Sequence, residues 1–285
     1  MGTMNTPLPS LFVSHGSPMI ALEPREAGRF MQALGAEIVA RWGRPRAVIV
    51  ASAHSLTNDP SDAPVLLAAP RHEAVHDFRG FDPRLSRLRY DAPGAPELAS
   101  RVQALCRAGG VEVDVIDEGG LDHGIWTAMR YLFPQADVPL LPLAWPGDWM
   151  PARLFKLGQA LAPLTADGVL VVGSGSITHN LRRVFASGRM PAVDQPVTPE
   201  SQAFREWFAT ASAAADWPAL FDYRRQAPHA ELMHPTDEHL LPWFVAAGAG
   251  GGGTPGRRIH ASFTHGDLGM DAYAFGPAAA TFAAA

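Results

Sequence analysis

The sequence predicts an α/β fold, in which a central, mostly parallel (mixed) β-sheet is flanked by helices on both faces. Short β-branched or apolar runs alternate with longer runs of helical spacing along the 285 residues, a pattern typical of βαβ units. Apolar residues make up 47% of the chain and charged residues 18%, so the chain can bury a sizeable core. Because no internal repeat and no long linker divide this pattern, we expect a single domain over residues 1–285.

The expected strands are the short apolar runs, and the expected helices are the runs of helical spacing between them. Strands are predicted at residues 11–15, 46–54, 111–117, 138–144 and 168–176. Helices are predicted at residues 26–40, 96–108, 125–132, 151–161 and 199–215. The stretch AAGAGGGGTPG at 246–256 predicts a flexible surface loop after a helix. In such parallel sheets ligands sit at the carboxyl ends of the strands.

Charge and cysteine content exclude several classes of protein. The chain has 23 Lys and Arg against 28 Asp and Glu, a net charge of −5, which argues against nucleic-acid binding. The one cysteine, Cys106, cannot form an internal disulfide and falls in an expected helix, where a buried, inert thiol is predicted. We see no signal-peptide pattern and no uncharged apolar run of about 18 residues. We therefore expect a cytoplasmic protein with no membrane partner.

Three histidines follow expected strands. His15 and His54 end the first two strands, and His179 comes a few residues after the last one. Gly16 and Pro18 predict a turn directly after His15, which would hold its ring at the strand tip. We therefore expect three imidazoles to gather at one edge of the sheet.

Three more histidines lie in short polar motifs. His123 stands in L-D-H-G-I-W, just before an expected helix, and His234 and His239 stand in H-P-T-D-E-H-L-L-P. Pro235 and Thr236 predict a helix start, which would place His239 on that helix and His234 before it. Neutral imidazoles that converge without cysteines suit zinc, iron or copper.

Two other motifs indicate different chemistry and have weaker support. Residues 72–76, H-E-A-V-H, match a zinc-protease pattern. That pattern needs a helix, and the nearby Pro70, Gly80 and Pro83 leave little room for one. The turn G-S-G-S at 173–176 could cradle a phosphate, but it has neither the Lys of a P-loop nor the third Gly of a dinucleotide site.

Seven motifs in order give the chain a resemblance to a known family. They are L-F-V-S-H-G-S-P-M, A-S-A-H-S, H-D-F-R-G-F, G-L-D-H-G-I-W, G-S-G-S-I-T-H-N-L, H-P-T-D-E-H-L-L-P and G-D-L-G-M-D-A-Y. On these residues the sequence resembles the DODA-type extradiol aromatic ring-opening dioxygenases of the class III, LigB-like superfamily. The resemblance implies a LigB-like α/β fold in a single catalytic domain.

The resemblance also implies roles for individual residues. The metal ligands would be His15, His54 and His239. The general base beside the metal would be His179, and the proton donor or dioxygen-orienting group would be His123. The remaining site positions, in the surroundings of the metal or the substrate pocket, would be His234, His76, Asp77 and Ser17.

The implied reaction is the ring opening of a catechol-type substrate with dioxygen. The small aromatic diol and dioxygen would be the partners, and a homo-oligomer is compatible with the sequence. Fe(II) is expected for turnover and Zn(II) in purified protein, because an all-histidine set has no charge-compensating carboxylate. Asp122 and Glu238 are neighbours that could supply one. A zinc-dependent hydrolase with His179 as base and a non-catalytic metal-binding homologue are the alternative functions.

Overall fold

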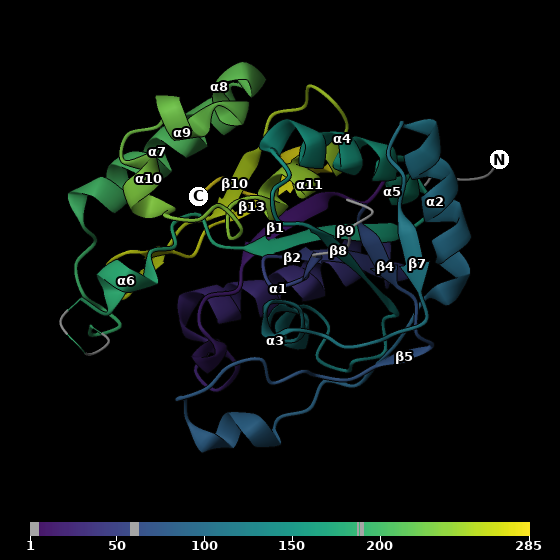
Figure 1. Cartoon of the computed structure of the whole chain (residues 1–285), viewed down its shortest axis with the longest axis horizontal. Coiled ribbons are helices and arrows are strands. Elements are labelled where there is room, and N and C mark those ends of the chain that lie inside the picture. Colours follow the sequence, from purple (N-terminus) through teal and green to yellow (C-terminus); the bar gives the residue numbers. More distant parts are fainter. Residues whose placement is uncertain (1–5, 58–62, 187, 189–190) are drawn as a thin grey trace.

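A mixed sheet of nine strands forms the centre of the computed structural model, which describes residues 6–57, 63–186, 188 and 191–285 (Figure 1). The strand order is β10-β13-β1-β9-β2-β8-β4-β7, with β3 paired to β8. The four central strands β1, β9, β2 and β8 are parallel to one another. Antiparallel strands flank them, because β13 pairs with β1 on one side and β4 pairs with β8 on the other. The prediction of a mostly parallel, mixed sheet is confirmed.

The strands of the large sheet are β1 (Ser10–Ser14), β2 (Ala47–Ser52), β3 (Leu56–Thr57), β4 (Val65–Leu67), β7 (Asp114–Ile116), β8 (Leu140–Pro146), β9 (Val169–Gly175), β10 (Arg257–His260) and β13 (Ala272–Phe275). Two small ribbons contain β5 (Arg71–His72) with β6 (Ala92–Pro93), and β11 (Phe263–Thr264) with β12 (Leu268–Gly269). The α-helices are α1 (Arg25–Trp42), α2 (Ala99–Ala108), α3 (His123–Leu132), α4 (Pro151–Leu161), α5 (Pro163–Ala166), α6 (Leu181–Val184), α7 (Pro199–Ala213), α8 (Trp217–Phe221), α9 (Tyr223–Gln226), α10 (Ala230–Met233) and α11 (Pro242–Ala249). Short 3₁₀ helices are η1 (Pro18–Ala21), η2 (Pro83–Arg87), η3 (Pro96–Leu98) and η4 (Pro277–Thr281).

Each face of the sheet supports its own hydrophobic core. Along β1, Leu11 and Val13 belong to the core that also contains apolar residues of α1 and α3. Phe12 between them belongs to the opposite core, which contains residues of α2, α4, α7 and α11. This alternation follows from the two-residue period of a strand. The helices lie on both sides of the sheet, as predicted (Figure 1).

Some predicted boundaries are wrong. The strand expected at 111–117 is only β7, an exposed edge strand that pairs with β4. The C-terminal strands β10 and β13 were not predicted, although they extend the sheet beside β1. The loop expected at 246–256 begins later, because α11 continues to Ala249 and is buried throughout.

The buried extension of α11 depends on glycines at the contact with α4. A Cβ on Gly158 would lie 2.1 Å from the carbonyl oxygen of Val245, and a Cβ on Gly248 would lie 2.1 Å from that of Phe155. No real Cβ tolerates such a distance to backbone, so the two helix backbones touch at these positions. A Gly-rich sequence therefore continues a helix here, because close packing offsets its poor helix propensity.

Burial and surface charge agree with the expectations for this chain. Cys106 is fully buried, and burial raises the pKa of its thiol to about 12, so the prediction of an inert thiol is confirmed.

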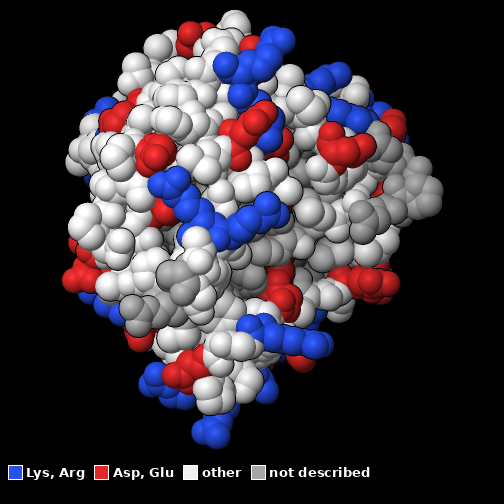
Figure 2. Space-filling model, turned by 60° about the vertical axis from the view of Figure 1, so that its left-hand side comes forward, with Lys and Arg blue, Asp and Glu red and all other residues white. Residues whose placement is uncertain are grey.

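Acidic and basic side chains are interspersed over the face shown in Figure 2. The absence of a nucleic-acid partner stays a prediction. Within the described ranges, no helix combines the length and the apolar character needed to cross a membrane.

We predict that Gly158→Ala destabilises the fold by at least about 1–3 kcal/mol, because the added methyl group overpacks a contact between two backbones. Urea denaturation followed by circular dichroism measures the change in the free energy of unfolding. Lys156→Ala, at an exposed position of the same helix, is the control and should stay within about 0.5 kcal/mol of wild type. Equal stability of the two variants would contradict the packing account.

Candidate active site

The parallel strands bring three histidines to one edge of the sheet. His15 directly follows β1, His54 lies two residues after β2, and His179 lies four residues after β9. Because β1, β9 and β2 are adjacent and parallel, their carboxyl ends meet. Gly16 has a φ of +64° and Pro18 opens η1, so the chain turns away immediately after His15. The expected turn and the expected gathering of imidazoles are both present.

The hydrogen bonds around His15 fix which ring nitrogen carries its proton. The Nδ1 atom of His15 lies 3.0 Å from the hydroxyl oxygen of Ser174. That hydroxyl donates its only proton to the carbonyl oxygen of Gly124, at 2.6 Å, so it accepts from Nδ1–H. The Nε2 atom of His15 therefore carries a lone pair, and it lies 3.2 Å from Nε2 of His54.

The carboxylate of Asp77 orients His123, as the hydroxyl of Ser174 orients His15. His123 is the first residue of α3, and its Nδ1 atom lies 2.9 and 3.0 Å from the two oxygens of Asp77. Its ring centroid is 4.0 Å from that of His54. The preceding residue, Asp122, accepts hydrogen bonds from Ser52 at 2.7 Å and Ser55 at 2.5 Å and caps α3. Asp122 therefore anchors the start of this helix to the loop after β2.

His239 and His179 form the other side of the cluster. Their rings stack with centroids 3.4 Å apart and planes inclined by 10°. The Nδ1 atom of His239 donates to a carboxylate oxygen of Glu238 at 3.0 Å. Both carboxylates that the sequence suggested as possible metal ligands thus have hydrogen-bond partners in this structure, Asp122 at the start of α3 and Glu238 on a histidine.

The predicted helix start at Pro235 is wrong. His239 lies in a turn that precedes α11. The carboxylate of Asp237 does not cap a helix, because it binds the hydroxyl of Tyr223 and the guanidinium of Arg224. The backbone N–H of Ser176, the residue after β9, donates to the carbonyl oxygen of His239 at 2.8 Å. This hydrogen bond keeps the turn against the sheet.

The donor atoms fit a metal ion. Ligand nitrogens of His15, His54 and His123 lie within 4.8 Å of one another. A second such group consists of His179, Glu238 and His239. Neighbouring nitrogens on a tetrahedral zinc, with bonds of about 2.0–2.1 Å, are about 3.3 Å apart, close to the 3.2 Å between His15 and His54. The lone pair on Nε2 of His15 therefore faces Nε2 of His54 at a distance that suits a shared cation.

The grouping differs in one respect from the predicted roles. The rings of His15, His54 and His239 lie with centroids 4.9–5.5 Å apart, so the three expected ligands are neighbours. His123, expected as a proton donor, also has a nitrogen within reach of His15 and His54. All five imidazoles therefore belong to one cluster.

Burial keeps the imidazoles of His15, His54, His179 and His239 neutral. Desolvation, followed by the neighbouring imidazoles, lowers the pKa of His15 and of His239 well below the usual 6.5. Desolvation also lowers the pKa of His54. It lowers the pKa of His179 to about 4. At neutral pH the rings therefore offer lone pairs, which is the form that metals bind.

The other predicted site residues surround the cluster. His234 is fully buried and donates from Nε2 to the carbonyl oxygen of Ile177 at 2.7 Å, so it supports the turn before His179. His76 packs against Trp126, with ring centroids 5.8 Å apart. Ser17 lines a cavity that begins with Gly16, the residue after His15.

The two alternative motifs have structural explanations. Residues 71–72 form strand β5 and residues 73–78 form no helix, which excludes the zinc-protease arrangement. The turn expected at 173–176 is wrong, because residues 173–175 belong to strand β9. A Cβ on Gly173 would lie 2.1 Å from the carbonyl oxygen of Pro242, and one on Gly175 would lie 2.0 Å from that of His239. These glycines permit close packing of the turn that carries His239 and of α11 against β9.

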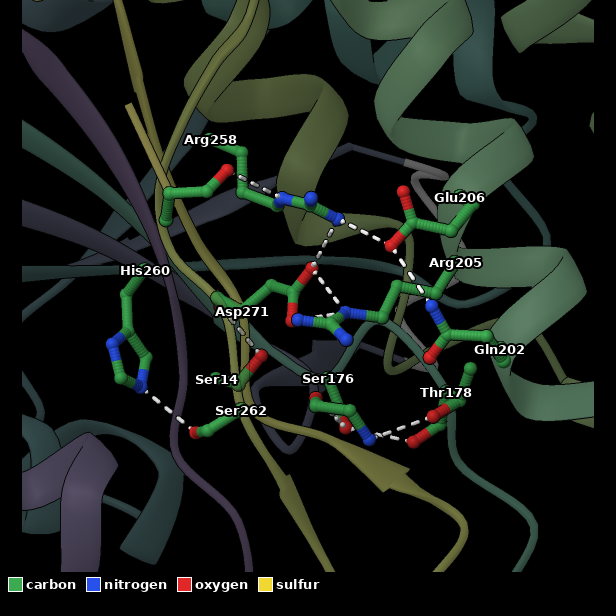
Figure 3. A network of polar contacts seen from close by, with 12 residues as sticks. Ser14, Ser176, Thr178, Gln202, Arg205, Glu206, Arg258, His260, Ser262 and Asp271 are labelled. Atoms are coloured by element: carbon green, nitrogen blue, oxygen red, sulfur yellow. Dashed lines mark hydrogen bonds and ion pairs between the residues drawn. The ribbon is translucent and has the colours of Figure 1, made fainter. Parts of the chain in front are cut away.

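A buried polar network behind the site was not predicted. The carboxylate of Asp271 receives Nε of Arg205 at 2.7 and 2.8 Å, and its backbone carbonyl accepts from the hydroxyl of Ser14 (Figure 3). Arg258 approaches the same carboxylate and binds Glu206 at 3.0 Å. Burial raises the pKa of Asp271 to about 6, while the guanidiniums oppose the rise. In the sequence, Asp271 stands in the family motif G-D-L-G-M-D-A-Y, but the motif alone did not indicate what this carboxylate does.

Comparisons with known proteins agree on one family. A family model described as the catalytic LigB subunit of aromatic ring-opening dioxygenase matches residues 9–276. The chain is 36% identical over 277 residues to a 4,5-DOPA dioxygenase extradiol of Beta vulgaris, covering 96% of this chain and 99% of the relative. It is 33% identical over 256 residues to a 4,5-DOPA dioxygenase extradiol of Escherichia coli K12, covering 88% of each. A crystal structure of an uncharacterized protein from Escherichia coli K12 superposes with a TM-score of 0.74 at 29% identity, covering 94% of this chain and 100% of that one.

We predict that His234 makes the fold less stable in acid. Burial lowers its pKa to about 4, whereas an unfolded histidine titrates near 6.5. The unfolded chain therefore binds the proton first, and stability that is present above pH 6.5 is lost as the pH falls toward 4. The stability difference between wild type and His234→Gln should shrink by about 1–2 kcal/mol from pH 7 to pH 5, measured by urea denaturation. His229→Gln, at an exposed position, is the control, and a constant difference for His234→Gln would contradict the prediction.

Proposed function

Because the chain belongs to the family of the catalytic LigB subunit of aromatic ring-opening dioxygenases, we propose that it is an extradiol dioxygenase that opens a catechol-type ring with dioxygen. The observation that carries the proposal is the cluster of neutral imidazoles at the carboxyl ends of β1, β2 and β9, with the Nε2 atoms of His15 and His54 only 3.2 Å apart. The names of the relatives support the extradiol position of cleavage and a DOPA-like or other ortho-diphenol as substrate.

His15, His54 and His239, whose ring centroids lie 4.9–5.5 Å apart, would hold the metal ion. A ligand nitrogen of His123 lies within 4.8 Å of those of His15 and His54. Fe(II) bound there would supply a redox-active template for the catechol and dioxygen, whereas Zn(II) has no redox chemistry. The protein's contribution is to keep the rings of His15, His54 and His239 neutral and to orient the whole cluster. Ser174, Asp77 and Glu238 each bind an Nδ1 atom, which aims the opposite nitrogen into the cluster.

His179 is suited to accept a phenolic proton. Burial keeps its ring unprotonated at neutral pH, and negative charge that develops on the substrate beside it would favour the protonated form. Its position is fixed, because its backbone N–H donates to Met233 at 3.0 Å and the neighbouring Asn180 donates to Leu232 at 2.6 Å.

His123 is suited to return a proton to the leaving oxygen. Its Nδ1 atom binds the carboxylate of Asp77, which directs Nε2 toward the cluster where the substrate oxygens would bind. His123 and His179 lie on different sides of the same cluster, which allows one to act as the acid and the other as the base.

Oxygen uptake tests the proposal directly. Protein that is stripped and reloaded anaerobically with Fe(II) is given L-DOPA and a panel of catechols in an oxygen electrode. We expect uptake of one dioxygen per catechol, matched by the visible absorbance of a ring-opened semialdehyde. No uptake by protein with measured iron would contradict the proposal, and zinc-loaded protein would then be assayed on esters and amides.

We predict that His179→Ala retains the metal and loses about 10²–10⁴-fold in turnover, the usual contribution of a general base. His15→Ala should instead lose the metal, measured by elemental analysis after dialysis. His229→Ala, on the exposed surface, is the control for both measurements. Normal turnover by His179→Ala would remove this residue from the mechanism.

We predict that the acid limb of kcat/KM lies below pH 6. The lowered pKa of His179, about 4, keeps the base active as the pH falls through 6.5, and activity is lost as the pH approaches the lowered value. Metal content is measured at each pH, so that loss of metal is separated from protonation of the base. An acid limb centred near 6.5 with full metal content would contradict this account.

A further inference from the structure

A cavity of about 460 Å³ begins at the two residues that follow His15. Its lining includes Gly16 and Ser17, which directly follow His15. Met270 lies against Gly16, because a Cβ on that glycine would be 2.8 Å from the Met270 methyl group. The cavity extends from there between the start of α1 and the β11–β12 ribbon. One end of it is therefore adjacent in sequence to an expected metal ligand.

The volume exceeds what a small catechol needs. Sites that hold whole organic ligands measure roughly 300–1,000 Å³, and one end of this cavity is formed by Gly16 and Ser17, next in the chain to the expected metal ligand His15. A methyl group or a short chain on the ring would leave most of the space unfilled. The occupant that matches the volume is a group about as large as a second aromatic ring.

Much of the wall is apolar and held in place from behind. Ile20, Val193 and Phe263 line the cavity. The guanidinium of Arg205 lies 4.4 Å from the ring centre of Phe263 and is itself fixed by the buried Asp271 (Figure 3). An apolar wall with a rigid aromatic face suits a planar, apolar group.

Charged residues at the cavity indicate a single negative charge on the occupant. Arg25 pairs with Glu23, whereas Arg29, one turn further along α1, has no ion pair among the residues that the structure describes. An exposed, unpaired guanidinium is available to a carboxylate. Glu26 and Asp194 also line the cavity, so a group with several negative charges would be repelled.

Backbone strain gathers at the same cavity. Arg25 and His265 both line it, and both have positive φ angles, 51° and 56°, although neither is glycine. His265 is held in this conformation by hydrogen bonds to the carbonyl oxygens of Val193 at 3.0 Å and Pro191 at 2.9 Å. Such conformations cost about 1–3 kcal/mol and occur preferentially at ligand sites.

We propose that this cavity is the subsite for the ring substituent of the substrate, and that it takes an aryl-sized, apolar group ending in one carboxylate that pairs with Arg29. The inference rests on the proposed function, since it assigns a substituent to the catechol that the histidine cluster would bind. It goes beyond that function by making Arg29 and the cavity walls the determinants of substrate choice.

Three catechols test the subsite: 4-methylcatechol, 4-phenylcatechol and 3′,4′-dihydroxybiphenyl-4-carboxylate. Arg29→Gln should raise KM about fivefold for the carboxylate alone, as expected for one exposed ion pair. Thr264→Trp, which enlarges a side chain that lines the cavity, should raise KM for both biphenyl compounds and leave 4-methylcatechol unchanged. Arg41→Gln, on the same helix but outside the cavity, should change none of them. If each catechol has the same KM in the wild type and in every variant, the subsite is overturned. The proposed dioxygenase function would not be affected by that result.

A binding measurement separates the subsite from the reaction. Zinc-loaded protein is titrated calorimetrically with 3′,4′-dihydroxybiphenyl-4-carboxylate and with 4-methylcatechol. The subsite is supported if the carboxylate binds more tightly than 4-methylcatechol and Arg29→Gln weakens that binding about fivefold. This support does not depend on turnover. If iron-loaded protein turned over no catechol, the proposed function alone would be overturned. Binding of the carboxylate that Arg29→Gln leaves unchanged would overturn the subsite. Arg29 is exposed, so its variant remains informative if Thr264→Trp fails to fold.

Discussion

The turn that carries His239 rests directly on the backbone of β9, and only glycine permits this approach. A Cβ on Gly175 would lie 2.0 Å from the carbonyl oxygen of His239, and a Cβ on Gly173 would lie 2.1 Å from that of Pro242. The contact brings a segment more than 60 residues further along the chain to the strand end where His15 and His179 lie. A larger residue at either glycine would push α11 and the turn away from the sheet, and the imidazole cluster would open.

A shell of hydrogen bonds then determines what the cluster can do. Ser174, Asp77 and Glu238 each hold the Nδ1 atom of one histidine. Burial lowers the pKa of His15 and of His239, so their inward nitrogens carry lone pairs. A buried lone pair is unfavourable without a partner. The burial and orientation of these rings therefore make the cluster a good ligand set for a cation.

Much of this arrangement could be predicted from sequence because it depends on local patterns. Apolar runs between helical runs predict parallel strands, and residues that follow such strands meet at one edge, which is why His15, His54 and His179 were found. The turn after His15 follows from Gly16 and Pro18. Seven motifs in order identified the family, and the family model confirms it.

The remaining features depend on contacts between distant segments. Asp77 reaches His123 from 46 residues away, and its partner cannot be read from spacing. The predicted helix start at Pro235 is wrong, and the carboxylate of Asp237 instead binds the side chains of Tyr223 and Arg224. Asp271 and Arg205 form a buried pair across 66 residues. In each case a tertiary partner, absent from the local sequence, decides the conformation.

We propose that this histidine cluster, loaded with Fe(II), inserts dioxygen into a catechol ring. Turnover under ¹⁸O₂ in ordinary water, followed by mass spectrometry of the ring-opened product, tests this reaction. We expect both atoms of one dioxygen molecule to enter the product, apart from label that the new aldehyde exchanges with water. A ring-opened or hydrolysed product that contains no label, when trapped before exchange, would contradict it.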